Sequence, residues 1–255
     1  MIVDLNGKKG LVIGIANQDS IAYGCARKFK EAGARMAITY LNEKAKPHVE
    51  PLATKLEADL LLPCNVMEKD ELETVYSEIK DKFGRLDFLL HSIAFAPKED
   101  LHREVYQCSR DGFMAAMDVS CYSLIEMTRL ALPLMSEGGS ILTMSYYGSE
   151  KVVKDYNLMG VAKAALESTV RYLAAELGHS GIRVNAISPG PIMTRAASGI
   201  KGFNELIDNS IQTAPLNTPV SIDGVGNLAA FLAADSGREI TGQVLLVDSG
   251  YSIIG

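Results

Sequence analysis

Short apolar runs recur along the whole chain, and stretches with helical spacing of apolar residues separate them. Runs of this length, bounded by glycine, proline or polar residues, are typical of strands buried in a parallel sheet. The pattern therefore predicts strands over residues 10–14, 36–40, 60–64, 86–92, 140–145, 183–187 and 243–248. Between them, the spacing of apolar residues predicts helices near 20–32, 70–83, 110–135, 158–178 and 223–234.

Strands that alternate with helices indicate a parallel sheet with right-handed crossovers and helices on both faces. We therefore expect an α/β chain with a single-domain Rossmann fold, a doubly wound parallel sheet of about seven strands. No linker, repeat or low-complexity segment divides the chain, so one domain over residues 1–255 is expected. Small and polar residues interrupt the pattern over 194–219, and such a stretch is typical of a substrate-binding loop or lid.

Composition agrees with a globular enzyme, because 47% of the 255 residues are hydrophobic and 22% are charged. The net charge is −6 and basic residues do not cluster, so no role in nucleic-acid binding is expected. No run approaches the roughly 18 apolar residues of a membrane span, and the first residues lack the apolar segment of a signal peptide. A cytoplasmic location without membrane contact is therefore expected.

The four cysteines lie far apart in the sequence and form no C-x-x-C pair. The four histidines also show no spacing typical of metal ligands. We expect neither a metal site nor a disulfide framework, and each cysteine is best interpreted as a small buried apolar residue.

The segment from Gly14 to Gly24 joins the first predicted strand to the first predicted helix. The start of a helix at this place offers free N–H groups and a positive dipole end, which suit a pyrophosphate. The segment lacks the usual G-x-G-x-x-G pattern, so a plain tight turn is the alternative interpretation. Its position after the first strand favours a dinucleotide site.

The second predicted strand ends without the acidic residue that usually binds the adenosine ribose. It also lacks an arginine for a 2′-phosphate. Glu43 would repel such a phosphate, whereas Lys44 and Lys46 would attract it. On this balance of charge we favour NADH over NADPH.

Tyr156 and Lys163 are seven residues apart, which is about two helical turns and would place both on one helix face. A lysine beside a phenol lowers the phenol pKa, and it can also bind ribose hydroxyls. A tyrosine hydroxyl over a substrate carbonyl would stabilise the oxyanion that forms during hydride addition. The alternative is that the tyrosines pack in the core and Lys163 extends to solvent.

These residues resemble the short-chain dehydrogenase/reductase superfamily and, within it, the bacterial enoyl-acyl-carrier-protein reductases. The resemblance runs from about Gly7 to Ser252. The usual superfamily signature is Tyr-x-x-x-Lys with a serine thirteen residues before the tyrosine, but Met159 and Tyr146 stand at those two positions. The enoyl reductase branch instead pairs two tyrosines with the lysine, as Tyr146, Tyr156 and Lys163 do.

Other segments resemble the same branch. The stretch 91–96 resembles the lining of the cofactor and acyl pocket, 188–194 resembles the nicotinamide-binding segment, and 196–200 resembles the start of the substrate-binding loop. Asn65 stands where the family usually has aspartate, and an amide oxygen can still accept from the adenine amino group. The resemblance implies cofactor contacts at Gly14, Ile15, Ser20, Ile21, Leu41, Asn65, Val66, Ser92, Ile93, Lys163, Ile192, Met193, Thr194, Arg195 and Ala196.

The resemblance implies that NADH reduces the trans-2 double bond of an enoyl thioester carried on acyl carrier protein, the last reductive step of type II fatty acid elongation. Tyr156 would bond the thioester oxygen of the resulting enolate, and Lys163 would bind the nicotinamide ribose. Tyr146 would be a second donor or a wall of the acyl pocket, and Ala96 would also contact substrate. A homotetramer is implied by the C-terminal segment 247–251.

Two other functions stay open at this point. One is a related reductase that acts on a carbonyl, but the absence of tyrosine at Met159 argues against it. The other is a nucleotide sensor without catalysis, because a fold alone does not determine function. The intact pair of Tyr156 and Lys163 argues against the sensor.

Overall fold

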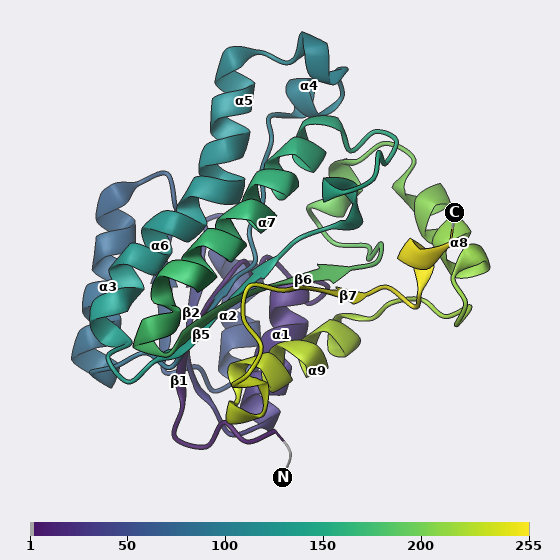
Figure 1. Cartoon of the computed structure of the whole chain (residues 1–255). Coiled ribbons are helices and arrows are strands. Elements are labelled where there is room, and N and C mark those ends of the chain that lie inside the picture. The colour runs from purple at the N-terminus through teal and green to yellow at the C-terminus, as the bar shows by residue number, and fades with distance from the viewer. Residues whose placement is uncertain (1–2, 255) are drawn as a thin grey trace.

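One sheet of seven parallel strands forms the centre of the molecule, in the order β3-β2-β1-β4-β5-β6-β7 (Figure 1). The structure is a computed structural model, and it describes residues 3–254. The predicted Rossmann-type α/β fold is confirmed, and each predicted strand is present within two residues of its expected bounds. The strands are β1 (Lys9–Ile13), β2 (Arg35–Tyr40), β3 (Leu60–Pro63), β4 (Phe88–His91), β5 (Gly139–Met144), β6 (Ile182–Pro189) and β7 (Val244–Val247).

The strand order reverses between β1 and β4, which pair side by side in parallel. The chain leaves β1 toward β2 and β3 on one side, then returns to add β4, β5, β6 and β7 on the other. Loops that follow β1 and β4 therefore diverge, and they leave a crevice at the carboxyl ends of these strands. Ligands of open α/β sheets bind at this kind of crevice.

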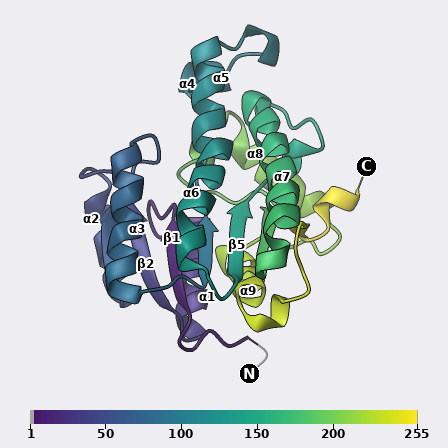
Figure 2. The ribbon, with the colours of Figure 1, turned by 60° about the vertical axis from the view of Figure 1, so that its left-hand side comes forward.

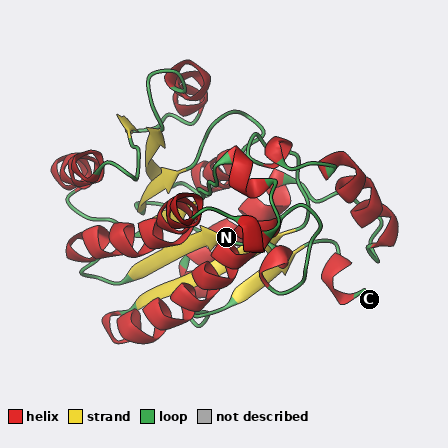
Figure 3. Ribbon diagram, turned by 90° about the horizontal axis from the view of Figure 1, so that it is seen from above, coloured by secondary structure: helices red, strands yellow, loops and turns green. Residues whose placement is uncertain are grey.

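Two apolar layers attach helices to the two faces of the sheet (Figure 3). One layer joins the sheet to α1 (Ile21–Glu31), α2 (Lys46–Lys55) and α9 (Ile222–Ala233). The other joins it to α3 (Lys69–Phe83), α6 (Ser123–Ala131) and α7 (Asn157–Leu177), which lie in front of the strands in Figure 2. No helix of residues 3–254 has the length and apolarity required to cross a bilayer.

The structure corrects the helices expected from the sequence at several places. Residues 110–131 are helical, but α5 (Arg110–Met117) and α6 are joined by a π-helical turn at Asp118–Tyr122, and a 3₁₀ turn follows at Leu132–Leu134. Helix α2 is an additional element, although it contains Pro51. Two further helices, α4 (Lys98–Leu101) and α8 (Phe203–Thr213), were also not expected, and α8 occupies much of the supposedly irregular segment 194–219.

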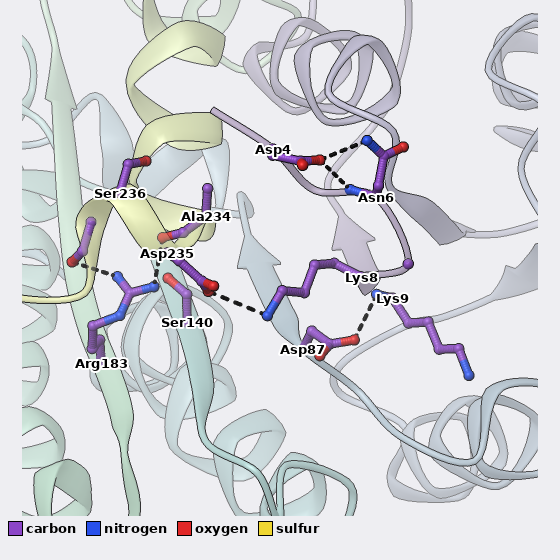
Figure 4. Close-up of polar contacts among 12 residues, drawn as sticks. Asp4, Asn6, Lys8, Lys9, Asp87, Ser140, Arg183, Ala234, Asp235 and Ser236 are labelled. Carbon is purple, nitrogen blue, oxygen red and sulfur yellow. Dashed lines mark hydrogen bonds and ion pairs between the residues drawn. The ribbon is translucent and has the colours of Figure 1, made fainter. Parts of the chain in front are cut away.

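Polar contacts fasten the amino ends of the strands to the end of α9 (Figure 4). The Arg183 guanidinium, at the start of β6, donates to the carbonyls of Leu232, Gly237 and Ala234 at 2.6, 3.0 and 3.3 Å. Ser140, at the start of β5, donates to the same Leu232 carbonyl at 2.9 Å. These bonds satisfy carbonyls that the end of a helix leaves free. These bonds fix the amino ends of β5 and β6 to the segment around the end of α9, whereas the crevice lies at the opposite, carboxyl ends of the strands.

Candidate active site

A cavity of about 430 Å³ lies at the carboxyl ends of β1, β4, β5 and β6. This volume falls in the range of small-molecule sites, and most of the lining is apolar. Four separate parts of the chain form its walls, within residues 14–21, 92–101, 144–163 and 189–203. The cavity thus occupies the crevice that the strand order creates.

Gly14 brings the loop after β1 directly against the end of β4. Its φ of +116° is a conformation that other residues rarely adopt, and a Cβ here would lie 2.0 Å from the Ser92 carbonyl oxygen. The Ser92 N–H also donates to the Ile13 carbonyl at 3.0 Å. Only glycine fits this close approach.

Ser20 shapes the turn that precedes α1. Its Oγ accepts from the N–H groups of Ala16 and Asn17 at 3.0 and 3.1 Å. The Ser20 N–H donates to the Asn17 carbonyl at 3.2 Å, and the helical hydrogen bonds begin at the Tyr23 N–H. Within residues 3–254, the N–H groups of Ile21 and Ala22 have no such acceptor, and Ile21 lies at the edge of the cavity, so these two are open to a ligand. A helix start with open N–H groups fits the pyrophosphate of a dinucleotide.

The predicted site residues fall into two groups. Thirteen line the cavity: Gly14, Ser20, Ile21, Ser92, Ile93, Ala96, Tyr146, Tyr156, Lys163, Ile192, Thr194, Arg195 and Ala196. The residues that do not line it are Ile15, Leu41, Asn65, Val66 and Met193. Leu41 follows β2, and Asn65 and Val66 follow β3, so these three lie at the same carboxyl edge, beside the cavity.

Two of these outlying residues differ from expectation in detail. Ile15 is buried in the apolar layer under α1, so only its backbone is available to a cofactor. The Asn65 side-chain oxygen already accepts from the Met67 N–H at 3.2 Å. An amide oxygen has two lone pairs, so one remains for an adenine amino group.

Tyr156 and Lys163 lie near the start of α7, as their spacing predicts. Tyr156 is the residue immediately before the helix, and Lys163 is buried two turns later. The Tyr156 ring packs edge-on against the Tyr146 ring, with centroids 4.8 Å apart and an interplanar angle of 65°. The structure therefore brings the two tyrosines and the lysine together on one wall of the cavity.

The backbone around Tyr156 is strained. Asp155 and Asn157 have φ values of 62° and 36°, in the left-handed region that few non-glycine residues occupy. The Asn157 side-chain amide donates to the carbonyls of Leu101 and Arg103 at 3.2 and 2.9 Å. These bonds hold the start of α7 against the end of α4 and the residues that follow it. Backbone strain of this kind is concentrated at functional sites.

Burial raises the pKa of the Tyr156 phenol above its ordinary value, and the neighbouring Tyr146 and Glu167 act in the same direction. The expectation that Lys163 lowers this pKa is therefore wrong in the present arrangement, because the cost of burying a phenolate dominates. Burial also lowers the pKa of Lys163, to about 8, although Glu167 opposes the change. The Lys163 ammonium donates to the Met144 carbonyl at 2.6 Å.

The Tyr146 hydroxyl is buried and has no hydrogen-bond partner among the described residues. Leaving a buried hydroxyl unpaired costs free energy, so such a group requires an explanation. Because Tyr146 lines the cavity, a ligand oxygen would complete its hydrogen bonding.

Several residues in and around the cavity were not expected from the sequence. Leu101 and Phe203 line the cavity from α4 and α8, and Met159 lines it from α7. Leu101 lies on a helix of a single turn, which is too short to give a periodic pattern. Phe203 begins a helical spacing of apolar residues that continues at Leu206, Ile207 and Ile211, so a signal for α8 was present and was missed. Glu167 is a buried acid four residues after Lys163, and that helical spacing was the available signal.

Side chains that could bind a metal ion do not cluster in the described part of the chain. Within residues 3–254, no three His, Cys, Asp or Glu side chains are grouped so that they could hold a metal ion.

Comparisons with known proteins identify relatives that use a nicotinamide dinucleotide. Residues 14–252 match the family model described as enoyl-(acyl carrier protein) reductase. The NADH-dependent enoyl-[acyl-carrier-protein] reductase of a Nostoc species is 50% identical over 100% of both chains. The Anaplasma phagocytophilum reductase, solved in complex with NAD, is 42% identical, with a TM-score of 0.94 over 100% of this chain and 95% of that one.

A third relative adds a second nucleotide. The Bacillus cereus reductase, solved with NADP⁺ and an indole naphthyridinone, is 47% identical, with a TM-score of 0.96 over 98% of each chain. Identity at this level over nearly the whole chain, together with the matching fold, determines the family. This chain belongs to the enoyl-(acyl carrier protein) reductase family.

Proposed function

We propose that this enoyl-acyl-carrier-protein reductase uses Tyr156, Tyr146 and Lys163 to reduce the trans-2 double bond of an enoyl thioester with NADH. The observation that carries these roles is the tyrosine pair on the cavity wall, with the unpaired Tyr146 hydroxyl buried beside it. The reaction is the reductive last step of fatty acid elongation. The reduced nicotinamide, when bound, supplies the hydride.

The chain contributes a dinucleotide site along one side of the cavity. The open N–H groups at the start of α1 would bind the pyrophosphate, and the segment 192–196 would border the nicotinamide half. Lys163 would leave the Met144 carbonyl and bind the nicotinamide ribose. Leu41, Asn65 and Val66 would border the adenosine half, beside the strands that end at the same edge.

The position of Tyr156 on the cavity wall suggests its role in the reaction. A tyrosine phenol is protonated at neutral pH, and burial raises the pKa of Tyr156 further, so Tyr156 would act as a hydrogen-bond donor. Its hydroxyl would donate to the thioester oxygen, where negative charge develops when the double bond is reduced. Tyr146 would be a second donor or a wall of the acyl pocket, in contact with Ala96 along the same cavity.

The acyl carrier protein is the proposed carrier of the substrate, as the names of the relatives state. The lid proposed over 194–219 contains α8, whose Phe203 lines the apolar part of the cavity. It would cover the acyl chain after the carrier delivers it. We also propose a single catalytic domain over residues 1–255 and a cytoplasmic location.

Exposed apolar side chains support the proposed homotetramer. Tyr122 and Ile125 are exposed at the start of α6, Val161 and Tyr172 are exposed on α7, and Leu246 is exposed on the edge strand β7. Surfaces of this kind often mark contacts between subunits. Light scattering on the purified chain should give a mass of about four times 27.5 kDa, and a monomeric mass would contradict the tetramer.

A turnover assay tests the proposed function. The protein is mixed with NADH and a crotonyl thioester, and loss of the reduced-nicotinamide absorbance is followed. Steady oxidation of NADH is expected, with NADPH tested in parallel because one relative was solved with NADP⁺. No turnover with either nucleotide would contradict the function.

A further inference from the structure

Glu167 is a buried acid for which the reaction described above has no role. Its side chain is 5% exposed, on the same face of α7 as Lys163, which is 4% exposed. Buried carboxylates are rare unless they are paired or hydrogen-bonded. Its Oε1 accepts from the hydroxyls of Ser145 and Ser149, the latter at 2.6 Å. The carboxylate therefore bonds both ends of one short turn.

That turn, residues 145–149, carries Tyr146 and packs closely on the start of α7. A Cβ on Gly148 would lie 2.5 Å from Cδ1 of Tyr156, and one on Gly160 would lie 2.7 Å from the Gly148 carbonyl oxygen. The backbones approach so closely because neither glycine has a side chain. A displacement of the turn would therefore move Tyr146 relative to Tyr156.

Lys163 and Glu167 bond two consecutive residues at the start of this turn. The Lys163 ammonium bonds the carbonyl of Met144, and the Glu167 carboxylate bonds the next residue, Ser145. Once Lys163 turns toward a ribose, it loses the Met144 bond while its charge stays buried. A buried ammonium without a counter-charge is costly, and Glu167 is a carboxylate on the next turn of the same helix.

We propose that Glu167 is a positioning residue for the reduction: it fixes the 145–149 turn that carries Tyr146, and it provides the counter-charge that keeps Lys163 protonated. The inference rests on the proposed roles of Tyr146 and Lys163. It assigns Glu167 no contact with substrate or cofactor, since Glu167 does not line the cavity.

The titratable groups that interact electrostatically with the Lys163 ammonium lie on several elements. Cys121, in the π-helical turn, and Glu167 both favour the protonated lysine. His91, at the end of β4, is buried and kept neutral, with its pKa lowered to about 3 by burial and by Lys163. Its ring nitrogens bond the hydroxyls of Thr143 and Ser123 at 2.8 Å. Glu167 is thus the principal counter-charge in this set.

The test compares pH profiles of kcat/KM for NADH. The wild-type enzyme should lose activity above a pH of about 8, as Lys163 loses its proton. In Glu167→Gln, which keeps the shape of the side chain without its charge, this alkaline limb should move down by about one pH unit. Its kcat should fall about tenfold. In Ser145→Ala/Ser149→Ala, which keeps the charge, kcat should fall while the limb stays in place.

Glu176→Gln is the matched control, because Glu176 is an exposed acid on the same helix. It should leave both the limb and kcat unchanged. A Glu167→Gln enzyme that is folded by circular dichroism but keeps the wild-type limb would overturn the proposal, even if kcat falls. If Glu167→Gln does not fold, Ser145→Ala/Ser149→Ala tests the proposal instead. An unchanged kcat in that variant, when it is folded, overturns the positioning role of Glu167. Wild-type turnover is measured first, so a failed function is distinguished from a failed inference.

Discussion

Replacing Tyr156 with phenylalanine is expected to lower kcat by about 100- to 1000-fold, the usual cost of removing one donor to a developing oxyanion. The phenyl ring preserves the edge-on packing against Tyr146, so the cavity keeps its shape. The Kd for NADH should stay within about twofold of wild type, because the hydroxyl bonds the thioester oxygen and not the nucleotide. Steady-state turnover and equilibrium binding of NADH measure the two effects separately.

Tyr106→Phe is the matched control, since Tyr106 is 84% exposed and does not line the cavity. It should not change kcat. If Tyr156→Phe weakens NADH binding as strongly as it lowers kcat, the tyrosine contributes to the nucleotide site and the proposed division of roles is wrong.

Replacing Lys163 with alanine is expected to raise the Kd for NADH by about ten- to 100-fold. A hydrogen bond from a charged donor contributes about 1.5–3 kcal/mol, and each 1.4 kcal/mol corresponds to tenfold in affinity. The chain has no tryptophan, so the fluorescence of NADH itself reports binding without interference from protein tryptophan.

Lys80→Ala provides the control, because it removes one positive charge from an exposed position on α3 that does not line the cavity. Its Kd for NADH should match wild type. An unchanged Kd in Lys163→Ala, together with a reduced kcat, would instead assign Lys163 to the chemical step.

The strands were predictable because each one is buried in a parallel sheet and therefore has a continuous run of apolar residues. A helix on the surface has apolar residues only at intervals. The helices were less predictable where local signals oppose the packing. Pro51 lies inside α2, and proline usually interrupts a helix. Helix α8 has apolar residues at helical spacing, namely Phe203, Leu206, Ile207 and Ile211, but of these only Phe203 is buried. The small and polar residues around the helix favoured an irregular segment.

The sequence was sufficient to predict which residues of the site lie on the same helix. The spacing of Tyr156 and Lys163 placed both on one helix, and the resemblance added Tyr146. Burial was not predictable from spacing, and burial determines the electrostatics. It raises the pKa of Tyr156 where the sequence suggested a lower value. The bond from Lys163 to the Met144 carbonyl also depends on tertiary packing.

The left-handed backbone on both sides of Tyr156 has a consequence for anyone who transplants this site into a designed scaffold. A designer could copy the helix and the lysine spacing and still misdirect the phenol, because Asp155 and Asn157 turn the chain immediately before and after it. The Asn157 amide then anchors that turn to the segment after α4. The smallest portable unit therefore includes a piece of chain more than fifty residues away in sequence.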